Sequence, residues 1–142
     1  MKKILFSAIA SLWLAGLVVS PVFAGDLENL SGKWTTKRKS AEGSLTQTLE
    51  IKKDKFVFKI VGADDTSVLY AEGDVKAEKS GPLQYLAFTH IKGGKNSDDL
   101  QSVDDDRICI YRLEDGKFYV GVNFDKERDK APYVETYTKA EK

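Results

Sequence analysis

The 142-residue chain has one cysteine and one histidine, and both scarcities exclude kinds of site. A single cysteine, Cys109, cannot form a disulfide within the chain, so the apolar core must stabilise the fold. The zinc sites built from paired histidines or cysteines are excluded too, because neither spacing can occur. Since Cys109 lies in an apolar stretch, we expect a buried, inert thiol. A reactive thiol or an intermolecular disulfide is the alternative.

A net charge of one sign is also lacking, because 22 basic residues balance 22 acidic ones. Such a chain has no long-range field to attract nucleic acid or anionic lipid. Basic residues do gather at 33–39 among plentiful aromatics, but a nucleic-acid surface also needs net positive charge. We therefore expect neither nucleic acid nor a membrane surface as a partner.

The N-terminal segment 1–24 has the three parts of a secretory signal peptide. Lys2 and Lys3 form the positive region, residues 4–19 are an uncharged apolar run, and Ala24 ends a cleavage site. An uncleaved membrane anchor is the alternative, but the run of about 16 residues is shorter than the ~20 of a spanning helix. No cysteine follows at which a lipid could be attached. We predict cleavage after Ala24 and a periplasmic or secreted protein without a membrane anchor.

Residues 25–142 are long enough for one domain, and they show almost no helical periodicity. Short runs with two-residue alternation recur instead, separated by Gly, Asp, Asn and Lys. Eight strands are predicted, at 34–39, 45–52, 55–60, 67–78, 83–91, 108–113, 118–124 and 133–139. Gly73 indicates a bulge in the fourth strand, and Asp115-Gly116 a tight hairpin between the sixth and seventh.

Eight antiparallel strands joined by short turns predict an all-β fold, either an up-and-down barrel or a sandwich. We favour an eight-stranded antiparallel barrel, because closure leaves no unpaired edge. Such a barrel is either filled by side chains or just holds one small ligand. The polar segment 92–106 is expected to be the longest loop.

Leu30-Ser31-Gly32-Lys33-Trp34, at the start of the first strand, resembles the opening Gly-x-Trp signature of lipocalins and the wider calycin superfamily. The segment 110–118 is similar to the late hairpin of short exported bacterial lipocalin-like proteins. The second lipocalin motif, a Thr-Asp-Tyr triplet, is missing. The resemblance implies a lipocalin-like barrel whose floor is closed by Trp34.

In that family an arginine from a late strand packs over the tryptophan, so the resemblance also implies a partner for Trp34. The candidates are Arg107, Arg112 and Arg128. Arg112 is favoured because it lies within a predicted strand, where a cation–π contact would contribute roughly 0.5–2 kcal/mol. The alternative is that all three arginines are solvated.

Catalytic and metal chemistry has little support, and we expect neither an enzyme nor a cofactor. His90 has no acidic or nucleophilic neighbour in sequence, so it is either a hydrogen-bonded strand residue or a pocket contact. Acidic residues gather at 98–106, but their spacing is not that of an EF-hand. A solvated loop is therefore expected there, with a weak Ca²⁺ site as the alternative.

Aromatic side chains are the richest class, and they serve either as core or as the wall of a pocket. The predicted function is binding of a small, largely apolar ligand near Trp34, by a monomeric exported barrel. The candidate ligand-binding residues are Trp34, Phe56, Phe58, Phe88, His90, Tyr111, Arg112 and Phe118. The alternative is a filled barrel that binds an envelope protein through the loop at 92–106.

Overall fold

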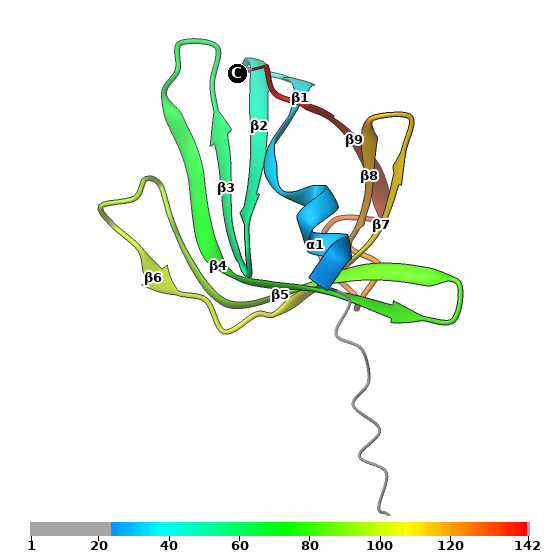
Figure 1. Ribbon diagram of the computed structural model, residues 1–142. Coiled ribbons are helices and arrows are strands. Elements are labelled where there is room, and N and C mark those ends of the chain that lie inside the picture. Colours follow the sequence, from blue (N-terminus) through cyan, green and yellow to red (C-terminus); the bar gives the residue numbers. More distant parts are fainter. Residues whose placement is uncertain (1–23, 142) are drawn as a thin grey trace, which may run out of the picture.

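The structure, a computed structural model, describes residues 24–141, so the predicted signal peptide lies outside the described residues except for Ala24. One short helix precedes nine strands (Figure 1). The elements are α1 (Ala24–Leu30), β1 (Gly32–Ser40), β2 (Gly43–Lys52), β3 (Lys55–Val61), β4 (Ser67–Ser80), β5 (Leu83–Gly94), β6 (Gln101–Ser102), β7 (Arg107–Glu114), β8 (Lys117–Val122) and β9 (Tyr133–Lys139).

Eight of these strands form a closed antiparallel barrel, which confirms the predicted fold and excludes the sandwich. Each strand pairs with the next along the chain, except that β5 pairs with β7 across the two-residue β6. The barrel closes where the first strand, β1, meets the last, β9. Strand β6 only adds a short edge beside the end of β5, through Lys92↔Ser102 and Gly93↔Gln101.

Two-residue alternation decides which side chains enter the barrel. In β2, Gln47, Leu49 and Ile51 are buried, while Thr48 and Glu50 between them are less so. The same pattern buries Cys109 and Tyr111 in β7. The predicted inward face of the second strand, with Leu49 and Ile51, is therefore confirmed.

One end of the barrel is closed by helix α1 and by large side chains, which together we call the floor. Leu30, Trp34, Tyr111 and Phe118 are buried there, and Leu27 of the helix packs against them. The ring of Phe118 is central, with its centroid 5.3 Å from that of Trp34 and 5.9 Å from that of Tyr111. The indole nitrogen of Trp34 donates to the Leu30 carbonyl oxygen (2.8 Å), so strand β1 fixes the end of the helix.

The seam between β1 and β9 is the most weakly paired part of the barrel. Only Trp34↔Lys139 and Thr35↔Thr138 pair, although β1 continues to Ser40 and β9 begins at Tyr133. Away from the floor, the two strands are therefore joined by side chains instead of backbone hydrogen bonds.

Both local irregularities predicted from the sequence are confirmed. The pairing of β4 with β5 shifts register between Glu72 and Asp74, around Gly73. A Cβ on Gly73 would lie 2.6 Å from the Thr89 carbonyl oxygen, so only glycine fits this bulge. Asp115 and Gly116 both have positive φ (52° and 72°), as a two-residue type I′ hairpin requires.

Besides shifts of one to three residues at most strand ends, the structure differs from the predicted elements in three places. Helix α1 was not anticipated, because a seven-residue helix leaves little periodicity to detect. The loop at 92–106 is shorter than expected, since β5 continues to Gly94 and β6 adds two residues. Strand β8 ends at Val122, because Asn123 adopts a left-handed φ of 62°, and Phe124 beyond it is half-exposed.

Candidate ligand-binding cavity

A cavity of about 960 Å³ occupies the half of the barrel opposite the floor. Its walls come from β1 to β5 and β7 to β9, and two loops, 95–106 and 123–132, flank its mouth. Pockets that hold small ligands in proteins span roughly 300–1,000 Å³. The barrel is therefore filled at one end and hollow at the other.

Most of the cavity wall is apolar. Aliphatic and aromatic side chains from five strands and from Val103 beyond β6 contribute to it: Leu49, Phe56, Phe58, Ile60, Leu69, Ala71, Phe88, Ile91, Val103, Val120 and Val122. The rings of Phe56 and Phe88 pack edge to face, with centroids 4.8 Å apart and planes at 77°, and both line the cavity. Such a wall removes apolar ligand surface from water.

Polar groups are concentrated along the β1–β9 seam, in a cluster that we call the polar strip: Arg38, Gln47, Tyr133, Glu135 and Tyr137. The Arg38 guanidinium lies 3.2 Å from Glu135 Oε1 and 5.3 Å from the centre of the Tyr133 ring. The Gln47 amide accepts from Arg38 and donates to Glu135 Oε2, both at 3.0 Å. The Tyr137 hydroxyl lies 3.3 Å from that amide. These contacts bridge the stretch where the strands are unpaired.

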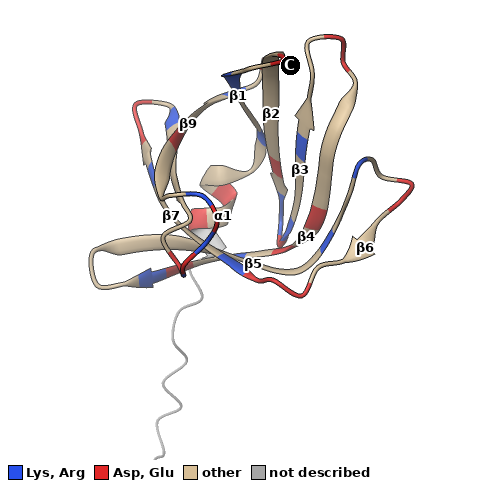
Figure 2. Ribbon diagram, turned by 180° about the vertical axis from the view of Figure 1, so that it is seen from behind, with Lys and Arg blue, Asp and Glu red and all other residues tan. Residues whose placement is uncertain are grey.

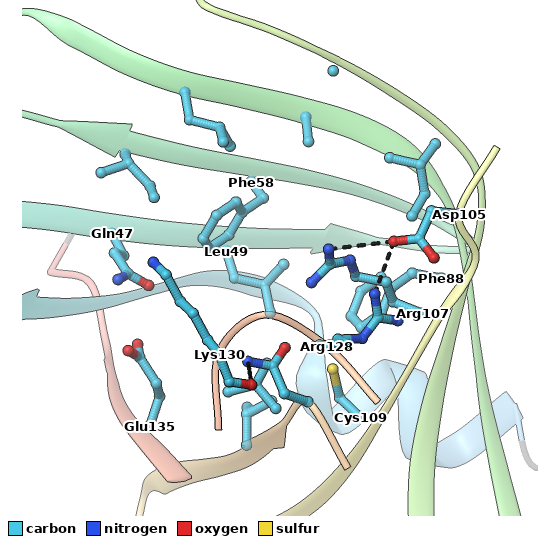
Figure 3. Close-up of a pocket in the computed structure, with 18 of the residues that line it drawn as sticks. Gln47, Leu49, Phe58, Phe88, Asp105, Arg107, Cys109, Arg128, Lys130 and Glu135 are labelled. Atoms are coloured by element: carbon cyan, nitrogen blue, oxygen red, sulfur yellow. Dashed lines mark hydrogen bonds and ion pairs between the residues drawn. The ribbon is translucent and has the colours of Figure 1, made fainter. Parts of the chain in front are cut away.

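Lys130, on the loop between β8 and β9, extends its side chain into the cavity. Figure 3 shows it pointing toward the side where Gln47 and Glu135 lie. The loop is held locally, because the Asn123 side-chain amide donates to the Lys130 carbonyl oxygen (3.2 Å). An ammonium group therefore faces the polar strip from across the mouth.

A second group of charges, the mouth cluster, ties the two loops together. Arg128 donates to both Asp125 oxygens (2.9 and 2.7 Å) and to Asp105 Oδ2 (2.8 Å). Lys126 and Arg107 also pair with Asp105. The Arg128 and Asp125 side chains are only 10% and 9% exposed, so this pair is largely shielded from water. Elsewhere, residues of both signs are spread over the strands and loops (Figure 2).

These contacts lower the pKa of both carboxyl groups. Hydrogen bonds from Lys126 and then Arg128 lower the pKa of Asp105 to about 2. The Arg128 guanidinium holds the pKa of Asp125 well below its ordinary range, and the Ile108 amide, which donates to Asp125 Oδ2 (3.1 Å), adds to this. Both carboxylates are therefore charged at neutral pH and clamp Arg128 in place.

Cys109 lies on the cavity wall, buried as expected and without a disulfide. Burial raises the pKa of its thiol to about 11, and the nearby Asp125 carboxylate adds to the shift. A thiol with so high a pKa is protonated at neutral pH and is a poor nucleophile.

The structure divides the sequence-predicted site residues into three groups. Phe56, Phe58 and Phe88 line the cavity. Trp34, Tyr111 and Phe118 lie in the floor and do not line it. His90 and Arg112 lie outside the barrel. The hollow part of the barrel therefore lies away from Trp34, where the ligand was expected.

The outer positions of His90 and Arg112 remove both from the candidate ligand-binding residues, and His90 is the hydrogen-bonded strand residue of the first reading. The His90 side chain is 81% exposed, and its Nδ1 lies 2.8 Å from Asp74 Oδ2 on the outer surface. Arg112 stacks over Tyr119 and pairs with Glu114 at 2.9 Å. Because Cys109 and Tyr111 point inward, strand alternation sends Arg112 outward.

The cation over Trp34 is a lysine, so the predicted arginine partner was wrong. Lys139 Nζ lies 5.1 Å from the indole ring centre. Lys139 is the register partner of Trp34 across the seam, which brings the two side chains together. The other two candidates, Arg107 and Arg128, belong to the mouth cluster.

Sequence reasoning missed the polar strip and Lys130. A usable signal existed for Glu135: it stands between Tyr133 and Tyr137 at two-residue spacing, and therefore on the same face of its strand. The signal for Arg38 was weaker, because alternation from Trp34 places it inward but five of its neighbours in 33–39 are polar. Lys130 lies in a loop, where periodicity gives no direction.

Neither a metal centre nor a membrane-spanning helix is found in the part of the chain described here. Across residues 24–141, three or more His, Cys, Asp or Glu side chains nowhere gather as they would around a metal ion. The described chain also has no helix with the length and apolar character needed to cross a bilayer.

Comparisons with protein-family models, with curated proteins and with solved structures found nothing that matches this chain. The closed eight-stranded barrel is compatible with a lipocalin-like fold. Its interior, apolar and open at one end, is the feature from which a function can be argued.

Proposed function

We propose that this protein binds one small, largely apolar molecule in the cavity between the floor and the mouth cluster. A single observation carries the proposal: an eight-stranded barrel encloses about 960 Å³ behind predominantly apolar walls. A protein of this size needs nearly all its apolar side chains for its core. A hollow half therefore lowers the stability of the free protein, and a role in binding would explain why it is kept.

Preorganisation supports the same proposal. The Phe56–Phe88 pair is packed edge to face on the cavity wall, and the mouth cluster joins the two loops at the mouth. Pockets that are largely formed before binding lose less conformational entropy when the ligand enters. The other predicted role, as a protein-binding module with a filled barrel, has less support because the interior is not filled.

The proposed setting is the bacterial periplasm or the exterior, reached through cleavage after Ala24, with the mature protein monomeric and lipocalin-like. Its support is the three-part signal in 1–24 and the Gly32-x-Trp34 signature at the floor. The intact mass of protein purified from the producing cells tests the export step. Loss of the 24 N-terminal residues is expected, and the full-length mass would contradict it.

Trp34 provides a direct test of binding, because it is the only tryptophan left after that cleavage. A dansyl-labelled alkyl probe is titrated into the mature protein, and energy transfer from the indole to the dansyl group is followed. We expect saturable transfer with one probe per chain. Unlabelled apolar molecules of similar size should displace the probe.

A matched pair of variants locates the binding. Ala71→Phe places a ring in the cavity, since Ala71 lines it and packs against the core. Ala87→Phe makes the same change in β5 at a position that does not line the cavity. We expect Ala71→Phe to weaken binding at least tenfold and Ala87→Phe to leave it unchanged. Equal affinity in both variants, or no saturable binding by the original protein, would overturn the proposal.

A further inference from the structure

We propose that the ligand carries an anionic head group, held at the β1–β9 seam between Arg38 and Lys130. The inference rests on the proposed binding function and adds to it the chemistry of one end of the ligand. Its starting point is that the cavity is apolar everywhere except at the polar strip and at the mouth.

Arg38 has donors to spare for such a head group. Its contacts with Glu135 (3.2 Å), Gln47 (3.0 Å) and the Tyr133 hydroxyl (3.4 Å) all use Nη1. Within residues 24–141, Nη2 and Nε of Arg38 have no hydrogen-bond partner. A carboxylate or phosphate oxygen pair matches two adjacent guanidinium N–H groups, which gives short and strong hydrogen bonds.

The aromatic ring of Tyr133 holds this guanidinium in position. Arg38 lies 5.3 Å from the ring centre, in the geometry of a cation–π contact. A planar guanidinium fixed in this way loses little entropy when it binds an anion. The side chain is still 43% exposed, so a head group can reach it from the mouth.

The charge balance at the seam decides the sign of the head group. Arg38 and Glu135 neutralise one another, whereas Lys130 has no ion-pair partner among the described residues. Other acids on the lining are Asp105, which is paired within the mouth cluster, and Glu127 and Asp129 on the mouth loop. Glu127 and Asp129 likewise make no ion pair within residues 24–141, so Lys130 is distinguished by its direction, toward Gln47 and Glu135, and not by a net charge of the lining (Figure 3).

Head groups of other kinds fit less well. At the polar strip, a cationic head would meet one carboxylate that already has its arginine, and would be repelled by Lys130. A neutral hydroxyl could hydrogen-bond with the polar strip but would leave the Lys130 charge uncompensated. A charged group inside an apolar cavity is expensive unless it is paired, and an anion lying between Arg38 and Lys130 is paired twice.

The test compares three ligands that share one alkyl chain: decanoate, decanol and decylammonium. Binding to the mature protein is measured by isothermal titration calorimetry below the concentration at which each compound self-associates. We expect decanoate to bind roughly tenfold more tightly than decanol, as one charge-assisted contact implies, and decylammonium to bind weakest.

Variants assign the preference to residues. Lys130→Gln should reduce the decanoate affinity roughly tenfold and leave decanol unchanged. Arg38→Gln should do the same, and Arg38→Lys should restore part of the loss. Lys37→Gln is the matched control, because Lys37 is exposed on the same strand and does not line the cavity.

Two failures are distinguishable. If decanoate and decanol bind equally well, or Lys130→Gln and Lys37→Gln behave alike with decanoate, the head-group inference is wrong and the proposed function stands. If neither compound binds to the original protein and the dansyl probe also fails, both are wrong.

Discussion

The indole nitrogen of Trp34 donates a hydrogen bond to the carbonyl oxygen of Leu30, with 2.8 Å between the two atoms. This bond joins the end of helix α1 to strand β1, and both side chains are at most 2% exposed. The C-terminal carbonyl groups of a helix lack partners within it, so a buried one needs a donor from elsewhere. Trp34 supplies it and thereby closes the floor below the cavity.

Replacing Trp34 with Phe should therefore destabilise the protein. The substitution removes the donor, leaves the Leu30 carbonyl oxygen buried without a partner, and opens space beside Phe118. We expect a loss of about 2 kcal/mol in the free energy of unfolding. Urea denaturation of the protein without residues 1–24, followed by circular dichroism, measures it, because that form of the variant has no tryptophan. An unchanged midpoint would contradict this account of the floor.

Lys139→Gln provides the comparison at the same place. It removes the cation over the Trp34 ring and keeps the packing of the floor. Because Lys139 is exposed, we expect a loss of about 0.5 kcal/mol, well below that for Trp34→Phe. Measured by the same denaturation, a larger loss for Lys139→Gln would show that the floor depends on charge more than on burial.

Arg128→Met should lower the free energy of unfolding more than the substitution of an exposed arginine such as Arg112. It leaves the Asp125 carboxylate, itself only 9% exposed, without its two guanidinium hydrogen bonds. We expect a loss of about 2 kcal/mol in the free energy of unfolding. Arg112→Met, which breaks an exposed surface pair with Glu114, should cost less than about 1 kcal/mol. Similar losses for the two variants would refute the role of the mouth cluster.

Acid should weaken the mouth through the same carboxylates. The pKa values of Asp105 and Asp125 are lower in the folded protein than the ordinary value of 3.8 that the unfolded chain retains. As the pH falls below about 5, the unfolded chain takes up protons first, so the stabilisation is present above that range and is lost toward pH 2. The free energy of unfolding, measured by denaturation at several pH values, should therefore fall less steeply with decreasing pH in Asp105→Asn than in the original protein. Parallel curves would contradict this.

Alternation with a period of two made the barrel predictable, since it appears in every long strand. It correctly put Leu49, Ile51, Phe56 and Phe58 on the inner face, and the Asp115-Gly116 turn located a hairpin. The same rule, followed along the chain from Cys109, would have placed Arg112 outside. That prediction failed because it followed the family resemblance and not the strand's own pattern.

The position of the cavity could not be read from the sequence. Whether an aromatic side chain fills a barrel or lines a hollow depends on which rings meet across it, and this is a matter of register and volume. Phe118 meets Trp34 and Tyr111 and seals one half, whereas Phe58 faces open space in the other. The seam between β1 and β9 likewise depends on where the two strands separate, which no local pattern indicates.

Cys109 should react slowly with Ellman's reagent while the protein is folded. Its thiol is buried, and its pKa of about 11 keeps it protonated at mildly alkaline pH. We expect the reaction to be complete within seconds in denaturant and to take at least a hundredfold longer without it. Since Cys109 lines the cavity, a bound ligand should slow the reaction further. Fast reaction of the folded protein, or no effect of a saturating ligand, would contradict this position.

The most direct test of the central claim is the set of nuclear Overhauser effects between bound decanoate and the isotope-labelled protein. The account predicts contacts from the alkyl chain to the Leu49 and Val120 methyl groups and to the rings of Phe58 and Phe88, all on the cavity wall. Contacts confined to the outer face of the barrel, or none at saturating decanoate, would contradict it.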